Sequence, residues 1–107
     1  MSVDEWSVSK PKAGVIVFRF CGRLSGEGGQ QSAAVLASAL DREPQDIIFE
    51  VVEMTGYETA ARTAWQATLF PKRKSIRSIT MRGGNHLVRL GGTVLAMALG
   101  CTIKFDS

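Results

Sequence analysis

Two kinds of spacing alternate along the chain, one typical of strands and the other typical of helices. Runs rich in β-branched and aromatic residues indicate strands at residues 15–21, 46–54 and 76–81. After each run, apolar residues recur three and four positions apart, which indicates helices at residues 30–40, 57–70 and 86–99. Shorter alternating runs predict an additional strand near each end of the chain, at residues 6–9 and 102–105.

The order of these elements, ββαβαβαβ, predicts an α/β fold. Because crossovers within a sheet are right-handed, strands from the second onward should be mostly parallel, while the turn at residues 10–14 makes the first antiparallel. The near-continuous apolarity of residues 15–21 predicts a central strand covered on both faces. We therefore expect a single domain over residues 1–107, with a mixed, mostly parallel sheet of about five strands and three main helices. Residues 1–5 are expected to be disordered.

Local signals mark the ends of these elements. Residues 22–29 are rich in glycine and predict a loop. Thr55, followed three positions later by Glu58, predicts a capping box at the start of the second helix. Asn85 is a favourable N-cap for the last helix, and Gly100 is a favourable residue just beyond its end.

Composition fits one globular domain. Hydrophobic residues make up 45% of the 107 residues and charged residues 21%, which excludes wholesale disorder. A net charge of +3 is too small to indicate the dense basic face of a nucleic-acid binder, so no nucleic-acid partner is expected. The longest apolar stretch, residues 90–101, is too short to span a bilayer, which needs about 20 residues. With no secretory signal visible, we expect a cytoplasmic protein.

Cys21 and Cys101 are the two cysteines, and both lie in apolar surroundings. This predicts buried, reduced thiols, with a disulfide left open only if two strand ends meet in space. The spacing of the cysteines, in a chain with one histidine, does not match a zinc site. No metal and no cofactor is therefore expected.

One segment resembles a known family. Residues 47–56 form a core strand that ends in Glu53-Met54-Thr55-Gly56. Together with the order of elements, this resembles the STAS domains of sulphate transporters and anti-sigma-factor antagonists, in which a core strand ends in an Asp-Leu-Ser-Gly-like turn. Residues 65–89, with a basic loop at 72–75, a strand and a Gly-Asn helix start, resemble bacterial STAS-like proteins of unassigned role. The resemblance covers about residues 6–105 and implies a regulatory domain that binds a protein partner.

A characteristic motif of that family is missing. STAS domains carry an Asp-Ser-Ser-Gly loop before a helix, and family kinases phosphorylate its serine. The resemblance places this loop at Ala61-Arg62-Thr63-Ala64. Because these residues fall inside a predicted helix, Thr63 is hard for a kinase to reach, and no phosphorylation switch is expected at this loop.

The last predicted helix is apolar over more of its circumference than one buried face needs. This excess favours a surface for a protein partner, a second copy of the chain being one option. We expect the contact surface to combine the start of the second helix with the exposed part of the last one, through Tyr57, Glu58, Arg62, His86 and Arg89. Since no nucleophile or orienting acid accompanies the histidine, no enzyme is expected. The leading interpretation is a non-enzymatic regulatory or scaffold module.

A second interpretation is a protein of the same fold that binds a small ligand, a nucleotide or a lipid. Gly83, Gly84 and Asn85 start the last helix, where free N–H groups and the helix dipole favour an anion, and Arg82 adds positive charge. The expected pocket lies between these residues and residues 25–29. An ordinary strand-to-helix turn with an asparagine cap explains the same motif without a ligand.

Overall fold

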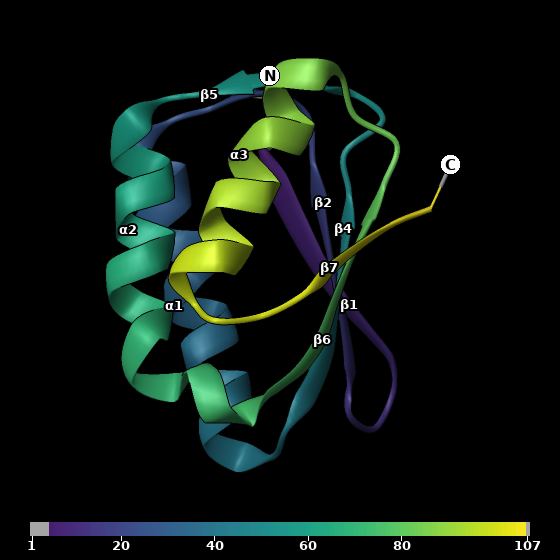
Figure 1. Ribbon diagram of the computed structural model, residues 1–107, viewed down its shortest axis with the longest axis vertical. Helices are drawn as coiled ribbons and strands as arrows, with labels where there is room; N and C mark the ends of the chain where they lie inside the picture. Colours follow the sequence, from purple (N-terminus) through teal and green to yellow (C-terminus); the bar gives the residue numbers. More distant parts are fainter. Residues whose placement is uncertain (1–4, 107) are drawn as a thin grey trace.

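The protein is built around a five-stranded sheet in the order β1–β2–β4–β6–β7 (Figure 1). The computed structural model describes residues 5–106. The strands are β1 (Trp6–Lys12), β2 (Val15–Phe20), β4 (Gln45–Glu50), β6 (Ile76–Arg82) and β7 (Ile103–Asp106). β1 is antiparallel to β2, and each of the other neighbouring pairs is parallel. The predicted mixed, mostly parallel sheet is confirmed.

Three helices lie on one side of this sheet, as Figure 1 shows. They are α1 (Gly26–Arg42), α2 (Thr59–Leu69) and α3 (His86–Ala98). The basic segment predicted to be a loop is instead the end of a short 3-10 helix, η1 (Phe70–Ser75), which has Pro71 in its first turn. Proline suits the first turn of a helix because the missing N–H would have no partner there.

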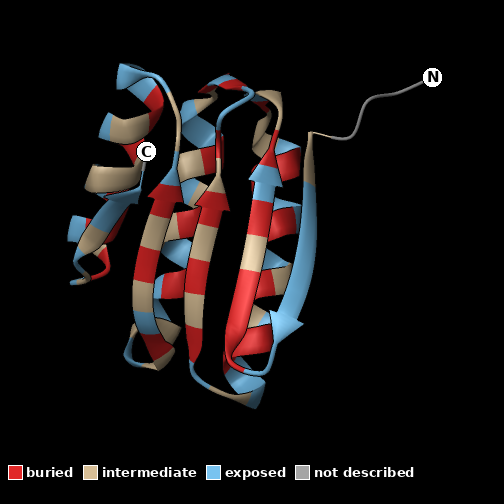
Figure 2. Cartoon of the chain, turned by 90° about the vertical axis from the view of Figure 1, so that its right-hand side faces the viewer, coloured by how far each residue is buried: buried red, intermediate tan, exposed pale blue. Residues whose placement is uncertain are grey.

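The opposite face of the sheet is open (Figure 2). In β2, Phe18 faces the helices and is fully buried, whereas Arg19 lies on the open face and is exposed. The prediction that this strand is covered on both faces is therefore wrong. Val17, also on the open face, has Ser9 and Ile48 as register partners, so side chains of neighbouring strands shield it instead of a second layer of helices.

A second, two-stranded parallel sheet lies at the carboxyl end of the main one. It pairs β3 (Gly22–Leu24) with β5 (Met54–Tyr57). The prediction of one strand over residues 46–54 is wrong, because the chain leaves the main sheet after Glu50 and turns before β5 begins. Periodicity alone does not reveal this break, since the turn contains the apolar pair Val51 and Val52.

The glycine-rich stretch at residues 22–29 is not the predicted loop, because it forms β3 and the first turn of α1. Gly29 lies where α1 crosses α2, and a Cβ atom added to it would come within 2.5 Å of the Ala61 Cα. Glycine is therefore required here for close approach of two helices and not for a turn. Gly22, with φ of +65°, is the position where the chain turns into β3.

Side-chain oxygens cap the start of α1. Ser25 Oγ accepts the Gly28 N–H at 3.1 Å, and Glu58 Oε1 accepts the Gly26 N–H at 2.6 Å. The predicted capping box at the start of α2 is wrong, because Thr55 belongs to β5 and the N-cap residue, Glu58, makes no side-chain cap bond to α2. Its carboxylate stabilises the neighbouring helix instead.

The predicted ends of the last helix are confirmed. Asn85 caps α3 by accepting the Val88 N–H at 2.9 Å. Gly100 follows the helix with φ of +69°, a left-handed conformation that favours glycine. Of the five residues predicted to be disordered, residues 1–4 lie outside the described part of the chain, and the Glu5 carboxylate accepts the Ser25 N–H at 2.7 Å.

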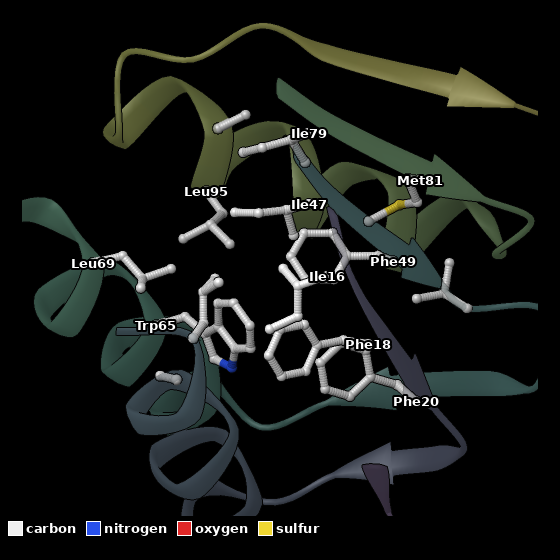
Figure 3. Close-up of a cluster of buried hydrophobic side chains, with 14 of the residues drawn as sticks. Ile16, Phe18, Phe20, Ile47, Phe49, Trp65, Leu69, Ile79, Met81 and Leu95 are labelled. Carbon is white, nitrogen blue, oxygen red and sulfur yellow. The ribbon is translucent and has the colours of Figure 1, made fainter. Parts of the chain in front are cut away.

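The core is organised around Trp65 of α2 (Figure 3). Its ring meets Phe18, Phe20 and Phe49 edge-on, with centroid distances of 5.3, 6.0 and 5.4 Å. Edge-to-face contacts of this kind are favourable beyond the apolar area that they bury. The ring is 3% exposed, so the sequence-based placement of Trp65 in the core is confirmed.

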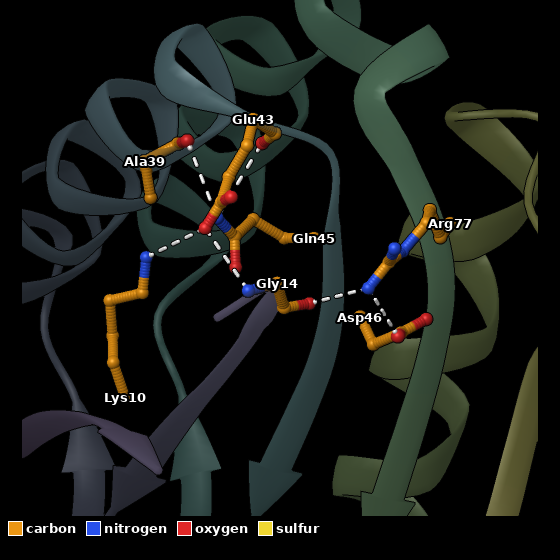
Figure 4. Close-up of polar contacts among 7 residues, drawn as sticks. All are labelled: Lys10, Gly14, Ala39, Glu43, Gln45, Asp46 and Arg77. Carbon is orange, nitrogen blue, oxygen red and sulfur yellow. Dashed lines mark hydrogen bonds and ion pairs between the residues drawn. The ribbon is translucent and has the colours of Figure 1, made fainter. Parts of the chain in front are cut away.

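Polar contacts connect the segments at the amino-terminal ends of the parallel strands (Figure 4). The Glu43 carboxylate accepts the Gly14 N–H at 3.0 Å and lies 3.5 Å from Lys10 Nζ. The backbone hydrogen bond from Gly14 is the main cause that lowers the pKa of Glu43. Arg77 donates both to the Gly14 carbonyl, at 2.9 Å, and to the Asp46 carboxylate, at 2.8 Å. The β1–β2 turn is thereby held against the starts of β4 and β6.

Candidate functional site

An apolar pocket of about 70 Å³ lies among α2, α3, β5 and the main sheet. Gly91 and Gly92 of α3 form part of its wall, and Tyr57 and Arg62 form another part. The remaining lining side chains are all apolar, and several are drawn in Figure 3: Phe20, Leu24, Phe49, Val51, Met54, Ala61, Trp65, Met81, Val88 and Leu95. Protein interiors hold few voids larger than a water molecule, so an apolar space of this size is a candidate site for a ligand group.

Among the lining residues, Tyr57, Arg62 and Gly92 are half-buried and the rest are buried, so the pocket opens to the surface beside these three. Tyr57 ends β5, and its ring packs against α3 at Gly91, where a Cβ atom would lie 2.5 Å from the phenolic oxygen. Arg62 lies in the second turn of α2. Its guanidinium forms no ion pair with any residue in the range 5–106. The mouth of the pocket therefore carries one phenol and one positive charge without a counter-ion.

A row of exposed apolar side chains runs along α3, and we call it the α3 stripe: Leu87, Leu90, Val94 and Met97. Their exposed fractions are 53%, 52%, 38% and 74%. Spacings of three and four residues place them on one face of the helix. Leu87 and Val94 lie one turn to either side of Gly91, so the stripe borders the pocket. The second apolar face expected for this helix is present in the structure.

The five residues predicted for partner binding are not all in one place. Tyr57 and Arg62 meet at the pocket mouth, whereas the Glu58 carboxylate is engaged at the start of α1. Arg89 lies on the side of α3 that faces β7, where its guanidinium is 5.0 Å from the Phe105 ring and its Nε donates to a backbone carbonyl. His86 is exposed at the start of α3, and its side chain makes no hydrogen bond to any described residue.

The residues of the predicted anion site have other partners. Arg82 lies 3.3 Å from Glu50 and 3.7 Å from Asp106, both on the open face of the sheet. The Asn85 side chain caps α3 and also donates to the Thr55 carbonyl at 3.2 Å, so β5 lies between the starts of α3 and α1. Gly83 and Gly84 have φ values of +76° and +94°, as a tight strand-to-helix turn requires. The geometry is that of a capped turn.

Charges alternate across the open face at the carboxyl ends of the strands. Arg19, Glu50, Arg82 and Asp106 are register partners on four neighbouring strands. Arg19 also lies 3.0 Å from Glu53, which follows β4. These pairs are half-exposed, so each contributes at most about 1 kcal/mol. Their effect is to keep this uncovered face polar.

The first residue of α2, Thr59, carries an exposed hydroxyl that the sequence does not indicate. Residues 61–64 do lie inside α2, as predicted. The helix, however, begins at Thr59 and not at residue 57, and the Thr59 side chain is exposed. No local signal distinguishes this start, because the chain passes from β5 to α2 through a single residue, Glu58.

Cys21 and Cys101 are free thiols, and both are half-buried, so their burial is less complete than predicted. Cys21 Sγ donates to the Glu53 carboxylate at 3.5 Å, and burial raises the pKa of Cys101. Within residues 5–106, no three metal-ligating side chains cluster. None of the helices in this part of the chain has the length and apolarity needed to cross a membrane.

Comparisons with known proteins identify the fold. No family model and no curated protein matches the sequence. An uncharacterized protein of the DUF3478 family from Shewanella loihica PV-4, with a SpoIIAA-like fold, gives a TM-score of 0.70 at 18% identity, covering 95% of this chain and 84% of that one. The anti-sigma factor antagonist SpoIIAA in its unphosphorylated form also gives 0.70, at 9% identity, with 95% and 87% covered.

The chain therefore has the SpoIIAA-like fold, and the resemblance to STAS-like domains seen in its sequence is confirmed for the fold. One of these two structures is that of a regulatory protein, an anti-sigma factor antagonist. At these identities the comparison carries no residue of the site from one protein to the other.

The sequence indicates two residues at the pocket mouth but not the pocket itself. Its pattern predicts Tyr57 and Arg62 as partner residues, and no local signal shows that they border a cavity. The glycine pair in α3 is the signal that was available, because a Cβ atom on Gly92 would lie 2.4 Å from the Met81 Cε. Such a pair brings the helix backbone close to its neighbours, but only the fold shows which side chains then leave space between them.

Proposed function

We propose that this protein is a non-enzymatic regulatory or scaffold module that binds a protein partner, either another protein or a second copy of this chain. The observation that carries the proposal is the α3 stripe, four exposed apolar side chains on one face of the helix that borders the pocket. Apolar anchors rimmed by charge are typical of binding surfaces. Burying such side chains against a partner is favourable by about 25 cal/mol per Å² of apolar surface.

The fold supports a regulatory role of this kind, since a structure with the same fold is an anti-sigma factor antagonist. A cytoplasmic, bacterial setting is part of the proposal. The proposed contact surface comprises Tyr57, Arg62, His86 and the α3 stripe. Glu58 and Arg89, which the sequence also predicts for partner binding, are proposed as supporting residues, because Glu58 caps α1 and Arg89 packs on Phe105.

Two further elements of the proposal concern chemistry. The pocket lining has only two ionisable side chains, Tyr57 and Arg62, and this supports a binding role over catalysis. We also propose that phosphorylation does not control binding, because Thr63 lies within α2. Thr59 is the hydroxyl whose modification would contradict this, and a Thr59→Glu variant is expected to bind its partner as the wild type does.

The test compares variants in two assays, light scattering after size exclusion for self-association and cross-linked affinity capture for other partners. Leu90→Glu places a charge in the middle of the α3 stripe and should abolish the dimer or the captured partner. Arg62→Glu should weaken binding at least tenfold. Ala34→Glu on the exposed face of α1 is the matched control and should bind normally.

Leu90 is 52% exposed, so its replacement should change the free energy of unfolding by no more than about 0.5 kcal/mol. A thermal melt separates loss of binding from loss of folding. If Leu90→Glu and Arg62→Glu retain the partner while folded, the assignment of the surface is wrong. A monomer that captures no partner in cells would count against the function itself.

The pocket favours a second candidate function, the binding of a small ligand. An apolar, largely preformed cavity with few polar groups at its mouth is the usual form of such a site. A lipid-like molecule suits this lining better than a nucleotide, because the walls offer no polar side chain other than Tyr57 and Arg62. A thermal-shift panel of lipids and nucleotides tests the candidate, since a ligand at 100 times its Kd adds about 2.7 kcal/mol of stability.

A further inference from the structure

We propose that the pocket between α2 and α3 binds a small monocarboxylate with a short alkyl chain, the chain inside the pocket and the carboxylate at Arg62. This rests on the second candidate function above, and it names the ligand class and the residues. It places the site away from residues 82–85, where the sequence suggested an anion.

The size of the pocket sets the length of the ligand's alkyl chain. A water molecule needs about 10–15 Å³ of such space, so the 70 Å³ found here accommodates about five to seven groups of that size. Five carbons beyond the carboxylate, as in hexanoate, therefore fill the pocket, whereas butanoate leaves part of it empty. Chains much longer than this extend past the walls.

The side chains that line the pocket determine which chemical groups of the ligand can enter it. Phe49, Trp65, Val88 and Leu95 approach the space from β4, α2 and α3, and none offers an uncommitted hydrogen-bonding group. The Trp65 indole N–H is already donated to Ser32 Oγ at 2.9 Å. A polar group in the pocket would lose its hydrogen bonds with water and gain none, which is costly. The occupant of the interior must therefore be apolar.

The mouth sets the charge of the head group. Arg62 is the one positively charged residue that lines the pocket, and it has no counter-ion among residues 5–106. A guanidinium binds a carboxylate through two parallel hydrogen bonds. The Tyr57 hydroxyl at the same mouth can donate a third. One apolar chain and one carboxylate thus match the two parts of the site.

The test is a titration followed by amide chemical-shift changes, with acetate, butanoate, hexanoate, octanoate and uncharged hexanol as probes. Affinity should rise about fourfold per added methylene up to hexanoate and then level off. Hexanol should bind more weakly than hexanoate. The amides that shift should be those of the pocket lining. Equal affinities for acetate and hexanoate, or for hexanol and hexanoate, would overturn the proposal.

Three variants complete the experiment. Arg62→Gln should weaken hexanoate about three- to tenfold and leave hexanol unchanged, while Arg42→Gln, at an exposed arginine in the last turn of α1, is the matched control. Val88→Phe fills the pocket and should abolish binding of both probes. Equal losses in Arg62→Gln and Arg42→Gln contradict the carboxylate site. The chain-length series on the wild type decides the matter if Val88→Phe does not fold.

The outcomes separate this inference from the small-ligand function on which it rests. If hexanol binds as tightly as hexanoate and Val88→Phe abolishes both, the pocket is a ligand site and the carboxylate class is wrong. If no probe shifts the pocket amides, small-ligand binding at this site fails as well. Neither result affects partner binding, which the Leu90→Glu variant tests on the α3 stripe.

Discussion

The Trp65 indole N–H donates a hydrogen bond to the Ser32 hydroxyl at 2.9 Å, and this contact joins the interior faces of α2 and α1. Ser32 is fully buried and donates in turn to the Gly28 carbonyl at 2.7 Å. The serine hydroxyl thus satisfies a donor that would otherwise be buried without a partner. A buried donor without an acceptor lowers the free energy of unfolding, because it has lost its hydrogen bonds with water and gained none.

Ser32→Ala should therefore lower the free energy of unfolding by about 1–3 kcal/mol, because the Trp65 N–H loses its acceptor. Urea denaturation, followed by tryptophan fluorescence, measures the change. Ser38→Ala, at an exposed position on the same helix, should change stability by less than about 0.5 kcal/mol. Similar values for the two variants would show that the buried hydrogen bond contributes little.

Gly29→Ala should destabilise the protein by about 1–3 kcal/mol, because the added methyl group would meet the Ala61 backbone at 2.5 Å. Helix propensity alone predicts the opposite sign, since alanine is favoured over glycine inside a helix by about 0.5–1 kcal/mol. Gly92→Ala is the control, because its methyl group would meet the flexible end of Met81. Its cost should be at least about 1 kcal/mol smaller in thermal or urea unfolding.

Asp46 should make stability depend on pH in the acid range. The hydrogen bond from Ser78 Oγ, at 2.6 Å, and the Arg77 guanidinium hold the pKa of Asp46 below its ordinary value, against the opposing effect of burial. Because the folded pKa is the lower one, this stabilisation is present above the unfolded pKa of about 3.9 and is lost as pH falls through the folded value.

Asp46→Asn should thus cost at most about 1 kcal/mol at pH 7, since the carboxylate is partly exposed. The difference from the wild type should shrink as the pH is lowered below 4. Unfolding by urea at a series of pH values measures both. A difference that stays constant between pH 7 and pH 2 would mean that the charge of Asp46 contributes nothing.

Cys101 should react slowly with alkylating reagents. Burial raises the pKa of its thiol, so the reactive thiolate is scarce at neutral pH. In a Cys21→Ser variant, the alkylation rate should have its midpoint above the ordinary thiol pKa of about 8.5. Unfolding in urea should return the midpoint to that value, and a folded midpoint at or below it would contradict the effect of burial.

Tertiary pairing explains where the sequence-based prediction of the fold failed. Residues 51–54 continue an apolar run, yet the chain leaves β4 at Glu50 because Met54 pairs with Gly22, which is distant in sequence. The glycines near residue 28 indicated a loop, but Gly29 is helical because α2 crosses there. Local sequence propensities do not depend on either of these long-range contacts, so they could not predict the two structures.

The candidate site shows the same division. Tyr57 and Arg62 could be selected from the sequence because they lie near the start of the helix predicted over residues 57–70, ahead of an unusually apolar last helix. That they border a cavity could not be predicted, since its walls come from segments distant in sequence, β2 to β6 together with α2 and α3. Arg82 and Arg89 were equally plausible in sequence, and both have partners within the fold.

The sequence by itself determined the elements whose signals are local: the alternation of strands and helices, the Asn85 cap, the Gly100 end and the excess apolarity of α3. Each depends on residues within one or two helical turns of one another, so spacing and side-chain chemistry suffice. Only the tertiary structure decided the open face of the sheet, the β3–β5 pair and the pocket. These depend on which distant segments pack together, and that is set by the burial of the whole core.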